Sequence, residues 1–554
     1  MKHRASVEPR CEGIIIRVGI HERNHKKALA LAKKVVQRQL RGKWVVSPLG
    51  RQSRDFEVSK AGKQKAIPVG TGWNYAYKLE SDRDVVDAEP IFEMCGLEPD
   101  PDLAGEQMTP RERNIAKSLG GDKHKICSVI PDWSIKDAKI NKAWEVALPS
   151  HRGGARYGRG IKVGHPDTGY TLHPEIWNNP NGWQRLRSHA GYDFVDDKQY
   201  PHDPFDKPHG GHGTKTSSVI MSDIGFEGGG PFVTGAAPEA VLVPYRVIRS
   251  VVVFNFKNVA KAIYEATDSG CHVISMSLGG PFPSKSLHRA IEYAVERGVI
   301  LCAAAGNVWR WVVYPAKYEE VVGVAASNCL RKPWGDSARG SAVDISAPGE
   351  SVWRAETIDD KNKQYAWKRG SGTSFAVATA AGVCALWLAY HGRSRLIERY
   401  GKKNLAPVFK ELVVTKGTDT PSGWDKGRYG SGILNAKKLL EAKLPDTPVA
   451  KGMRLSAKAP SAPGDPVSEL NDFFPGYGRA AVRKALAKEL RTTEDELDDM
   501  LRELGEEVMF HVATNAAFRQ SIQNRLMGVK AKSLRQNTRL LKHASTALRR
   551  RLKV

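Results

Sequence analysis

The chain has 554 residues, of which 41% are hydrophobic and 26% charged, and its formal net charge at pH 7 is +25. This length allows several domains, and the excess of Lys and Arg points to contact with polyanions or acidic substrates. The longest apolar stretch, Ala376 to Tyr390, is too short to cross a bilayer, so the composition predicts no membrane span.

Residues 1–125 predict a small α+β domain followed by a connecting segment. A strand-like run at Gly13–Val18 precedes a helix at Arg23–Leu40, in which Ala28, Leu31, Ala32, Val35 and Val36 recur at helical spacing. The remaining predicted elements are strands at Trp44–Val46, Phe56–Val58, Tyr75–Leu79 and Pro90–Glu93, and a short helix at Asp82–Val86. Together they give a βαββαβ-like order.

Two polar residues follow this domain in contexts that favour a functional site. Asp167 stands at the carboxyl end of a short predicted strand, Ile161–Gly169, which is where α/β sheets place their sites. His212 stands between glycines, just before a segment compatible with a helix, Lys215–Met221. Each feature alone is also typical of an ordinary turn or loop.

Two further motifs come later in the chain. An apolar strand, Val299–Asn307, ends in a glycine and the side-chain amide of Asn307. The glycine-rich turn Gly370–Ala376 places Ser374 at the start of an apolar helix, where unpaired N–H groups and the positive end of the helix dipole favour an oxyanion. By itself this serine is more typical of a plain helix cap.

The order acid, base, amide, nucleophile along the chain resembles the subtilisin-like (subtilase, S8) family of serine peptidases. Val273–Gly280 resembles the strand that pairs with extended substrate in this family, and Tyr314–Tyr318 resembles a segment beside the pocket for the residue before the cut. Further family-like segments occur in family order at Gly235–Ala240, Asp344–Gly349 and Arg428–Ala436. The resemblance runs from about Trp133 to Leu444. It implies an α/β fold for residues 126–444, a subtilisin-like three-layer sandwich with a mostly parallel central sheet.

The resemblance also implies a serine endopeptidase that acts on polypeptides through an acyl-enzyme. Asp167 would orient His212, His212 would act as the base for Ser374, and Asn307 would stabilise the oxyanion. The implied substrate-binding residues are Ser277, Leu278, Gly279, Gly280, Ala304, Ala305, Gly306 and Tyr314. A non-catalytic peptide-binding scaffold remains an alternative.

Several residues depart from the family pattern. Lys215 follows the base closely enough to lower its pKa, unless its side chain points into solvent. His165 and Pro166 stand before Asp167 where apolar strand residues are typical, so the local backbone is expected to differ. A proline is missing at Val377–Ala378, and the short segment after Asn307 carries Trp309 and Trp311, which allows an aromatic-walled or partly closed pocket.

No cofactor is expected. The cluster His202, Asp203, Asp206, His209 and His212 lacks zinc-type spacing on a helix, so we expect no catalytic metal. The loop Ser222–Val233 lacks a run of oxygen-bearing residues, which leaves a structural calcium ion open but unsupported.

By its position and pattern, the N-terminal domain is similar to the inhibitor-type prodomain of subtilases, whose tail lies in the cleft. The chain's own N-terminal domain is therefore an expected inhibitor, and Glu93–Lys125 is the candidate region for processing. Any other small α+β domain is the alternative.

Residues 445–470 read as a linker, because Pro, Ala, Ser and Lys dominate from Lys443 to Pro466. Residues 471–554 predict a basic helical module, with a capping box formed by Thr493 and Glu496 and an apolar face formed by Leu497, Met500, Leu501 and Leu504. No acidic residue follows Glu507. An acidic partner, a nucleic acid or anionic lipid would suit this tail, whereas a solvated helical face with a disordered end is the plain alternative. A protein whose main role is nucleic-acid binding is a further functional alternative.

The seven cysteines, Cys11, Cys95, Cys127, Cys271, Cys302, Cys329 and Cys384, are scattered, and most are expected to be reduced. The first residues do not resemble a signal peptide. A cytoplasmic location is expected from these two features.

Overall fold

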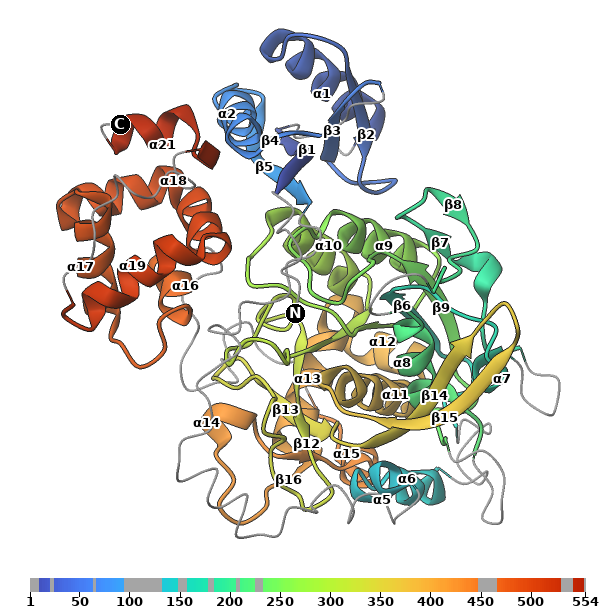
Figure 1. The fold of residues 1–554 in the computed structure, drawn as a ribbon. Helices are drawn as coiled ribbons and strands as arrows, with labels where there is room; N and C mark the ends of the chain where they lie inside the picture. Colours follow the sequence, from blue (N-terminus) through green and yellow to red (C-terminus); the bar gives the residue numbers. More distant parts are fainter. Residues whose placement is uncertain are drawn as a thin grey trace.

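The computed structural model describes residues 9–19, 24–62, 66–93, 132–147, 157–177, 184–205, 210–224, 233–446, 466–529 and 542–552. These residues form three structural bodies, which contact one another (Figure 1). They are an N-terminal domain, a large central domain and a C-terminal helical module. The predicted processing region after Glu93 and most of the predicted linker lie outside the described residues.

The N-terminal domain is a five-stranded sheet with two helices. Strand β1 (Arg10–Val18) is central and pairs antiparallel with β3 (Asp55–Lys60), β4 (Ile67–Pro68) and β5 (Val85–Glu93), and β2 (Trp44–Pro48) pairs with β3. Helix α1 (His25–Gln39) packs Ala28, Ala32, Val35 and Val36 into the core. The predicted helix from Arg23 to Leu40 is thus confirmed to within two residues at each end.

Two predicted elements of this domain are wrong. The predicted strand Tyr75–Leu79 lies in helix α2 (Val69–Glu80), which buries Val69, Trp73, Ala76 and Leu79 at intervals of four, three and three residues. That helical spacing outweighs the strand propensity of the tyrosines. The predicted helix Asp82–Val86 is a turn that leads into β5, and the carboxylate of Asp82 accepts hydrogen bonds from Arg38 there.

The central domain is built on a ten-stranded sheet with the order β16-β17-β13-β12-β11-β10-β6-β9-β7-β8. All neighbours from β17 to β7 are parallel, and only the outer pairs β16–β17 and β7–β8 are antiparallel. The strands are β6 (Lys162–Asp167), β7 (Tyr192–Asp193), β8 (Lys198–Gln199), β9 (Val241–Arg246), β10 (Val273–Met276), β11 (Ile300–Ala304), β12 (Val322–Ser327), β13 (Ile345–Pro348), β16 (Thr418–Asp419) and β17 (Ile433–Leu434). The predicted mostly parallel central sheet is confirmed.

Helices cover both faces of this sheet, which gives three layers (Figure 1). One apolar cluster includes residues of α5 (Trp133–Asp137), α6 (Ile140–Val146), α8 (His212–Met221), α11 (Thr373–His391) and α15 (Ala436–Glu441). A second cluster includes α9 (Lys257–Asp268) and α10 (Lys285–Glu296). The other helices are α7 (Pro174–Trp177), α12 (Arg393–Tyr400), α13 (Leu405–Thr415) and α14 (Lys426–Tyr429), and a hairpin is formed by β14 (Val352–Asp359) and β15 (Gln364–Gly370).

Helix α11 is long and apolar enough to cross a membrane by length and composition. However, 94% of its apolar window is buried inside the protein. The helix contacts strands β10 to β13 and serves as a core helix of the central domain.

The C-terminal module contains α16 (Pro466–Asp472), α17 (Arg479–Leu490), α18 (Glu494–Thr514), α19 (Ala516–Leu526) and α21 (Thr546–Arg551). The predicted capping box at Thr493 and Glu496 is confirmed, and Leu497, Met500, Leu501 and Leu504 are buried in the module's core. Helix α16 begins inside the segment predicted as linker.

The cysteines differ from expectation at one position. Cys11, Cys271, Cys302 and Cys384 are free and buried, as expected. Cys329 is disulfide-bonded. The expectation of reduced cysteines therefore holds for these four and not for Cys329. The cytoplasmic location, which is inferred in part from reduced cysteines, stays an expectation.

Candidate active site

Asp167 and His212 form a close pair. Asp167 ends β6 and is fully buried, and His212 begins α8, with Gly211 before it in the left-handed conformation (φ 73°). His212 Nδ1 donates to Asp167 Oδ1 at 2.7 Å. Burial alone would raise the pKa of Asp167, but His212 and the backbone N–H of Thr168 outweigh it and hold that pKa below its usual range. The carboxylate is therefore ionised and able to fix the orientation of the imidazole.

A second carboxylate, Asp203, holds the loops around this pair. Its Oδ2 accepts hydrogen bonds from Thr168 Oγ1 at 2.7 Å and from the backbone N–H of Gly211 at 2.8 Å. Thr168 Oγ1 in turn accepts from the N–H of Gly213 at 3.1 Å. Together these bonds connect Thr168, which follows Asp167, to Gly211 and Gly213, which stand on either side of His212. Sequence reasoning considered Asp203 only as a metal ligand and missed this role.

His165 lies directly behind Asp167. Its Nε2 is 3.8 Å from Asp167 Oδ2 and 3.1 Å from Thr216 Oγ1. Burial lowers its pKa to about 4, so this histidine is neutral near pH 7. The expected change in backbone does not occur, because β6 pairs with β9 through His165, Pro166 and Asp167 without a shift of register.

Ser374 occupies the first turn of α11 and is 6% exposed. Its Oγ donates to the carbonyl oxygen of Ser277 at 3.5 Å, and Ser277 Oγ donates back to the carbonyl of Ser374 at 3.1 Å. None of the hydrogen bonds found among the described residues joins Ser374 Oγ to His212. Helices α8 and α11, which carry His212 and Ser374, contact each other.

Asn307 is exposed and follows β11, and Thr373 fixes its side chain. Asn307 Oδ1 accepts hydrogen bonds from Thr373 N at 2.9 Å and from Thr373 Oγ1 at 2.7 Å. The amide nitrogen is thereby turned toward Gly372, where a Cβ would lie 3.4 Å from Nδ2. The asparagine thus presents an N–H donor beside the start of α11. Thr373 was not predicted, although it stands in the Gly-Thr-Ser motif.

The strand predicted to pair with substrate is already paired within the chain. Gly279 N donates to the carbonyl of Val251 at 3.0 Å, and Gly279 O accepts from Val253 N at 2.8 Å. Gly280 exchanges two backbone bonds of 2.9 Å with Tyr314. An extended peptide can therefore pair with Gly279 only after the Val251–Val253 segment has moved aside.

The second predicted group, Ala304, Ala305 and Gly306, lies beside Val313. Ala305 O accepts from Val313 N at 3.0 Å, and Gly306 N donates to Thr373 Oγ1 at 3.2 Å. The methyl groups of Val313 fill the space between two predicted segments: a Cβ at Gly279 would lie 2.5 Å, and one at Gly306 3.2 Å, from Val313 Cγ2. Leu278 is buried as well. The space between these segments is narrow in this conformation.

Lys215 and His202 contact acidic residues of the β14–β15 hairpin region. Lys215 Nζ is 3.5 Å from Glu356 of the β14–β15 hairpin, and burial and Arg354 lower the pKa of Lys215 to about 8. His202 Nε2 lies 2.8 Å from Asp360. Asp206, His209 and most of the loop Ser222–Val233 lie outside the described residues. The metal and calcium expectations stay untested.

The parallel sheet is covered on both faces, and an acid–histidine pair and a serine lie at strand and helix ends. This combination defines an α/β serine hydrolase. The family model described as the Subtilase family matches residues 158–432. Over 292 residues the chain is 32% identical to thermitase of Thermoactinomyces vulgaris, an alignment that covers 52% of this chain and 90% of thermitase. The chain therefore belongs to the subtilase family and is a subtilisin-like serine endopeptidase, as predicted.

Two further similarities agree with this assignment. Subtilisin Savinase of Lederbergia lenta is 29% identical over 299 residues, which cover 53% of this chain and 95% of that protein. The crystal structure of fervidolysin from Fervidobacterium pennivorans, a keratinolytic enzyme related to subtilisin, aligns with a TM-score of 0.53 at 20% identity and covers 80% of this chain and 63% of that one. This structural similarity supports the fold.

Proposed function

We propose that Asp167, His212 and Ser374 form the catalytic triad of this endopeptidase and that Asn307 belongs to its oxyanion hole. The observation that carries the proposal is the 2.7 Å bond between the buried Asp167 carboxylate and His212 Nδ1. Ser374 stands in the first turn of α11, which contacts the helix of His212. The substrate is a polypeptide. No cofactor is needed for this chemistry.

In the proposed reaction, Ser374 Oγ attacks a peptide carbonyl while its proton passes to His212 Nε2. Asp167 accepts the Nδ1–H bond throughout and stabilises the imidazolium without taking up the proton. His212 then donates the proton to the leaving amine, and the acyl group remains on Ser374. A water molecule, deprotonated by His212, then attacks the ester. His212 returns this proton to Ser374 Oγ as the second product leaves with its new carboxyl group.

The test of this proposal is hydrolysis of unfolded casein by the full chain, with and without prior exposure to phenylmethylsulfonyl fluoride. This reagent forms a stable sulfonyl ester with an activated serine. We expect the untreated chain to release peptides and the treated chain to release none. Peptide release at an undiminished rate after treatment would exclude a serine nucleophile.

Asn307→Ala is expected to lower kcat by about 10²–10³-fold, a magnitude taken from the oxyanion asparagine of subtilisin. KM should change little, because the amide contacts the oxyanion mainly in the transition state. Asn307→Asp is the matched variant, since it retains Oδ1 for Thr373 but replaces the donor nitrogen with oxygen. Steady-state kinetics on a peptide substrate give kcat and KM for both variants. Full activity of Asn307→Asp would show that Nδ2 is not the donor.

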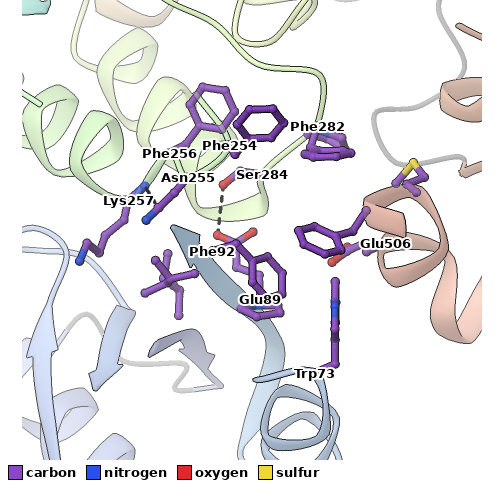
Figure 2. A pocket seen from close by; sticks show the side chains of 16 residues that line it. Trp73, Glu89, Phe92, Phe254, Asn255, Phe256, Lys257, Phe282, Ser284 and Glu506 are labelled. Atoms are coloured by element: carbon purple, nitrogen blue, oxygen red, sulfur yellow. Dashed lines mark hydrogen bonds between the residues drawn. The ribbon is translucent and has the colours of Figure 1, made fainter. Parts of the chain in front are cut away.

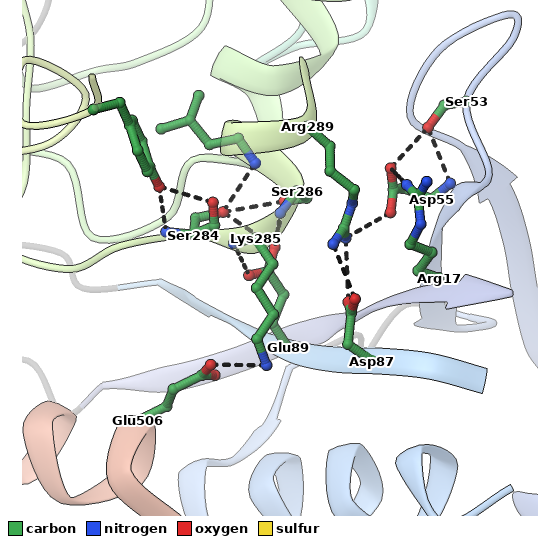
Figure 3. Close-up of polar contacts among 12 residues, drawn as sticks. Arg17, Ser53, Asp55, Asp87, Glu89, Ser284, Lys285, Ser286, Arg289 and Glu506 are labelled. Atoms are coloured by element: carbon green, nitrogen blue, oxygen red, sulfur yellow. Dashed lines mark hydrogen bonds and ion pairs between the residues drawn. The ribbon is translucent and has the colours of Figure 1, made fainter. Parts of the chain in front are cut away.

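We also propose that the N-terminal domain inhibits the peptidase. Glu89 of β5 accepts hydrogen bonds at the N-terminus of α10: from Lys285 N at 3.0 Å, from Ser286 N at 3.2 Å, and from the hydroxyls of Ser284 and Ser286 (Figure 3). A carboxylate at a helix N-terminus is favoured by the free N–H groups and the helix dipole. The sheet thus docks on α10 through a specific anion contact.

Ion pairs reinforce the docked position. Arg289 of α10 pairs with Asp55 at 2.6 Å and with Asp87 at 2.9 Å (Figure 3). Lys257 and Lys261 of α9 hold Glu57 at 2.9 and 2.7 Å. Burial would raise the pKa of Glu57, but the two lysines lower it to about 2. Phe92, at the end of β5, lines the same pocket as Phe254 and Phe282 of the peptidase.

Glu89→Ala is expected to raise the casein-hydrolysing activity of the full chain, because the variant weakens docking of the inhibitory domain. Loss of these bonds should cost about 1–3 kcal/mol, or about 5–150-fold in the docking equilibrium. Asp84→Ala is the control, because Asp84 pairs with Arg38 inside the N-terminal domain. Equal activity of Glu89→Ala and wild type would contradict inhibition through this contact.

The expected acidic or nucleic-acid partner stays a prediction. In the described part of the module, Arg525 pairs with Glu489 at 2.6 Å and Arg551 with Glu503 at 2.6 Å. Lys530, Lys532, Arg535 and Arg539 lie outside the described residues. A second function is therefore not proposed.

A further inference from the structure

The C-terminal module meets the other two bodies in a shared aromatic cluster. Phe510 of α18 lies 4.3 Å from Phe92 of β5, measured between ring centroids, and 6.3 Å from both Trp73 of α2 and Phe282 of the peptidase. Figure 2 shows Trp73, Phe92 and Phe282 around a pocket that residues of all three bodies line, Phe510 among them. Phe510 is 4% exposed, so its ring is covered by the two neighbouring bodies and not by water.

Polar contacts join the module to the N-terminal domain. Tyr77 OH donates to Glu507 Oε2 at 3.0 Å, and Thr546 N donates to Asn74 Oδ1 at 2.8 Å. Glu507 is fully buried and also accepts from Ser545 N and Oγ at 2.6 and 2.8 Å. At Gly70 a Cβ would lie 2.5 Å from the carbonyl oxygen of Ala544. Helix α2 therefore fits closely against the start of α21.

A separate set of contacts joins the module to the peptidase. Glu469 of α16 accepts from Tyr314 OH at 2.6 Å and pairs with Lys317 at 2.7 Å. Phe473 lies 5.1 Å from the ring of Trp311. Lys317 also pairs with Asp472 at 2.6 Å, and Lys285 pairs with Glu506 at 2.8 Å (Figure 3).

The module contacts both the N-terminal domain and the peptidase. The contacts of α16 and Phe473 lie on the peptidase segment after Asn307, and those of α21 lie on α2. Helix α18 contacts both sides, the N-terminal domain through Glu507 and Phe510 and the peptidase through Glu506 and Phe510. The module therefore spans the boundary between the N-terminal domain and the peptidase. A body that binds both sides of an interface at once stabilises the docked arrangement by the free energy of its own binding.

We propose that residues 466–529 and 542–552 form an intramolecular clamp whose binding partner is the composite surface made by the docked N-terminal domain and the peptidase. The clamp retains the N-terminal domain on the peptidase, including after the chain between Glu93 and Trp133 has been cut. Retention of the N-terminal domain is a binding property that can be measured without catalysis. A result that contradicts the clamp is therefore distinguishable from one that contradicts the inhibitory role proposed above.

The test uses the full chain carrying Ser374→Ala, which prevents self-cleavage, and a recognition site for a sequence-specific protease inserted between residues 96 and 130. After the protease has cut this site, the rate at which the N-terminal fragment leaves is followed by dilution and size-exclusion chromatography. Phe510→Ala should speed dissociation by about tenfold or more, since truncation of a buried aromatic anchor at an interface typically has effects of this size. Arg483→Ala is the control, because it removes an ion pair with Asp498 inside the module. An unchanged rate for Phe510→Ala would overturn the proposal.

Trp311→Ala keeps the test independent of the module's own folding. Trp311 belongs to the peptidase and contacts Phe473 of the module. If the module bridges the two bodies, this variant also speeds departure of the N-terminal fragment, by about five- to tenfold. If Phe510→Ala speeds departure and Trp311→Ala does not, the module holds the N-terminal domain without bridging to the peptidase, and the clamp is wrong.

Discussion

Replacing Ser374 with alanine is expected to lower kcat for peptide hydrolysis by about 10⁶-fold, a magnitude taken from loss of the nucleophile in subtilisin. Alanine has no hydroxyl to attack the carbonyl, and no acyl-enzyme forms. The residual rate would come from the rest of the site acting on bound substrate. The side chain is small and its hydroxyl makes only a 3.5 Å bond to Ser277, so the fold should be retained.

The matched control is Ser371→Ala, three residues earlier and exposed. Its Oγ accepts a hydrogen bond from the distant Ser351 N at 3.0 Å. Steady-state kinetics of both variants on one peptide substrate give their kcat values. The comparison separates loss of the hydroxyl at the helix start from loss of a hydroxyl in the segment before it. We expect Ser371→Ala to retain most activity. A Ser374→Ala chain with more than about one hundredth of wild-type kcat would contradict the assignment, given the expected loss.

Asp167→Asn is expected to lower kcat by about 10⁴-fold, as loss of the charge does in triads generally. The amide keeps the size of the side chain, but its NH₂ group favours the imidazole tautomer with the proton on Nε2, which cannot act as a base toward Ser374. Because the pKa of Asp167 is already below its usual range, the carboxylate is ionised across neutral pH, and the loss should persist at every pH from about 6 to 9.

The measurement is a kcat and KM series over this pH range, with thermal unfolding of both chains as a control for folding. A near-normal unfolding temperature together with the large loss of kcat separates catalysis from stability. If kcat falls by less than about tenfold, Asp167 does not set the tautomer of His212, since that role requires a far larger loss.

The parts of the fold and site that could be predicted from sequence depend on short, local patterns. Asp167 at a strand end, His212 after two glycines and Ser374 at the start of an apolar helix each follow from a few neighbouring residues, and their order along the chain identified the family. Helix α11 was predictable because its residues are apolar on every side, as a helix buried in a core requires.

The features that were missed depend on contacts between distant residues. Asp203 holds Gly211 and Thr168, and Thr373 orients Asn307 across 66 positions of sequence, which no spacing rule reveals. Pairing of Gly279 with Val251 and Val253 is likewise set by tertiary packing. In the N-terminal domain, the aromatic residues of α2 have strand propensity, and only the buried face formed by Val69, Trp73, Ala76 and Leu79 makes them helical.

The module's role was obscured by composition. Its positive charge suggested an external polyanion, yet the contacts that attach it to the other two bodies involve the acidic residues Glu469 and Glu507 and the aromatic residue Phe510. These three residues carry no recognisable motif. Their partners on the N-terminal domain and the peptidase are distant in sequence and are brought to them by tertiary packing.

The most direct test of the central claim is to map the adduct formed by a fluorophosphonate. The wild-type chain and the Glu89→Ala chain, in which docking of the N-terminal domain is weakened, are treated with the reagent, digested and analysed by peptide mass spectrometry. The account predicts one adduct, on Ser374, in at least the Glu89→Ala chain, and none when Ser374→Ala is added. An adduct on a different serine, or an unmodified Ser374 in both chains, would contradict it.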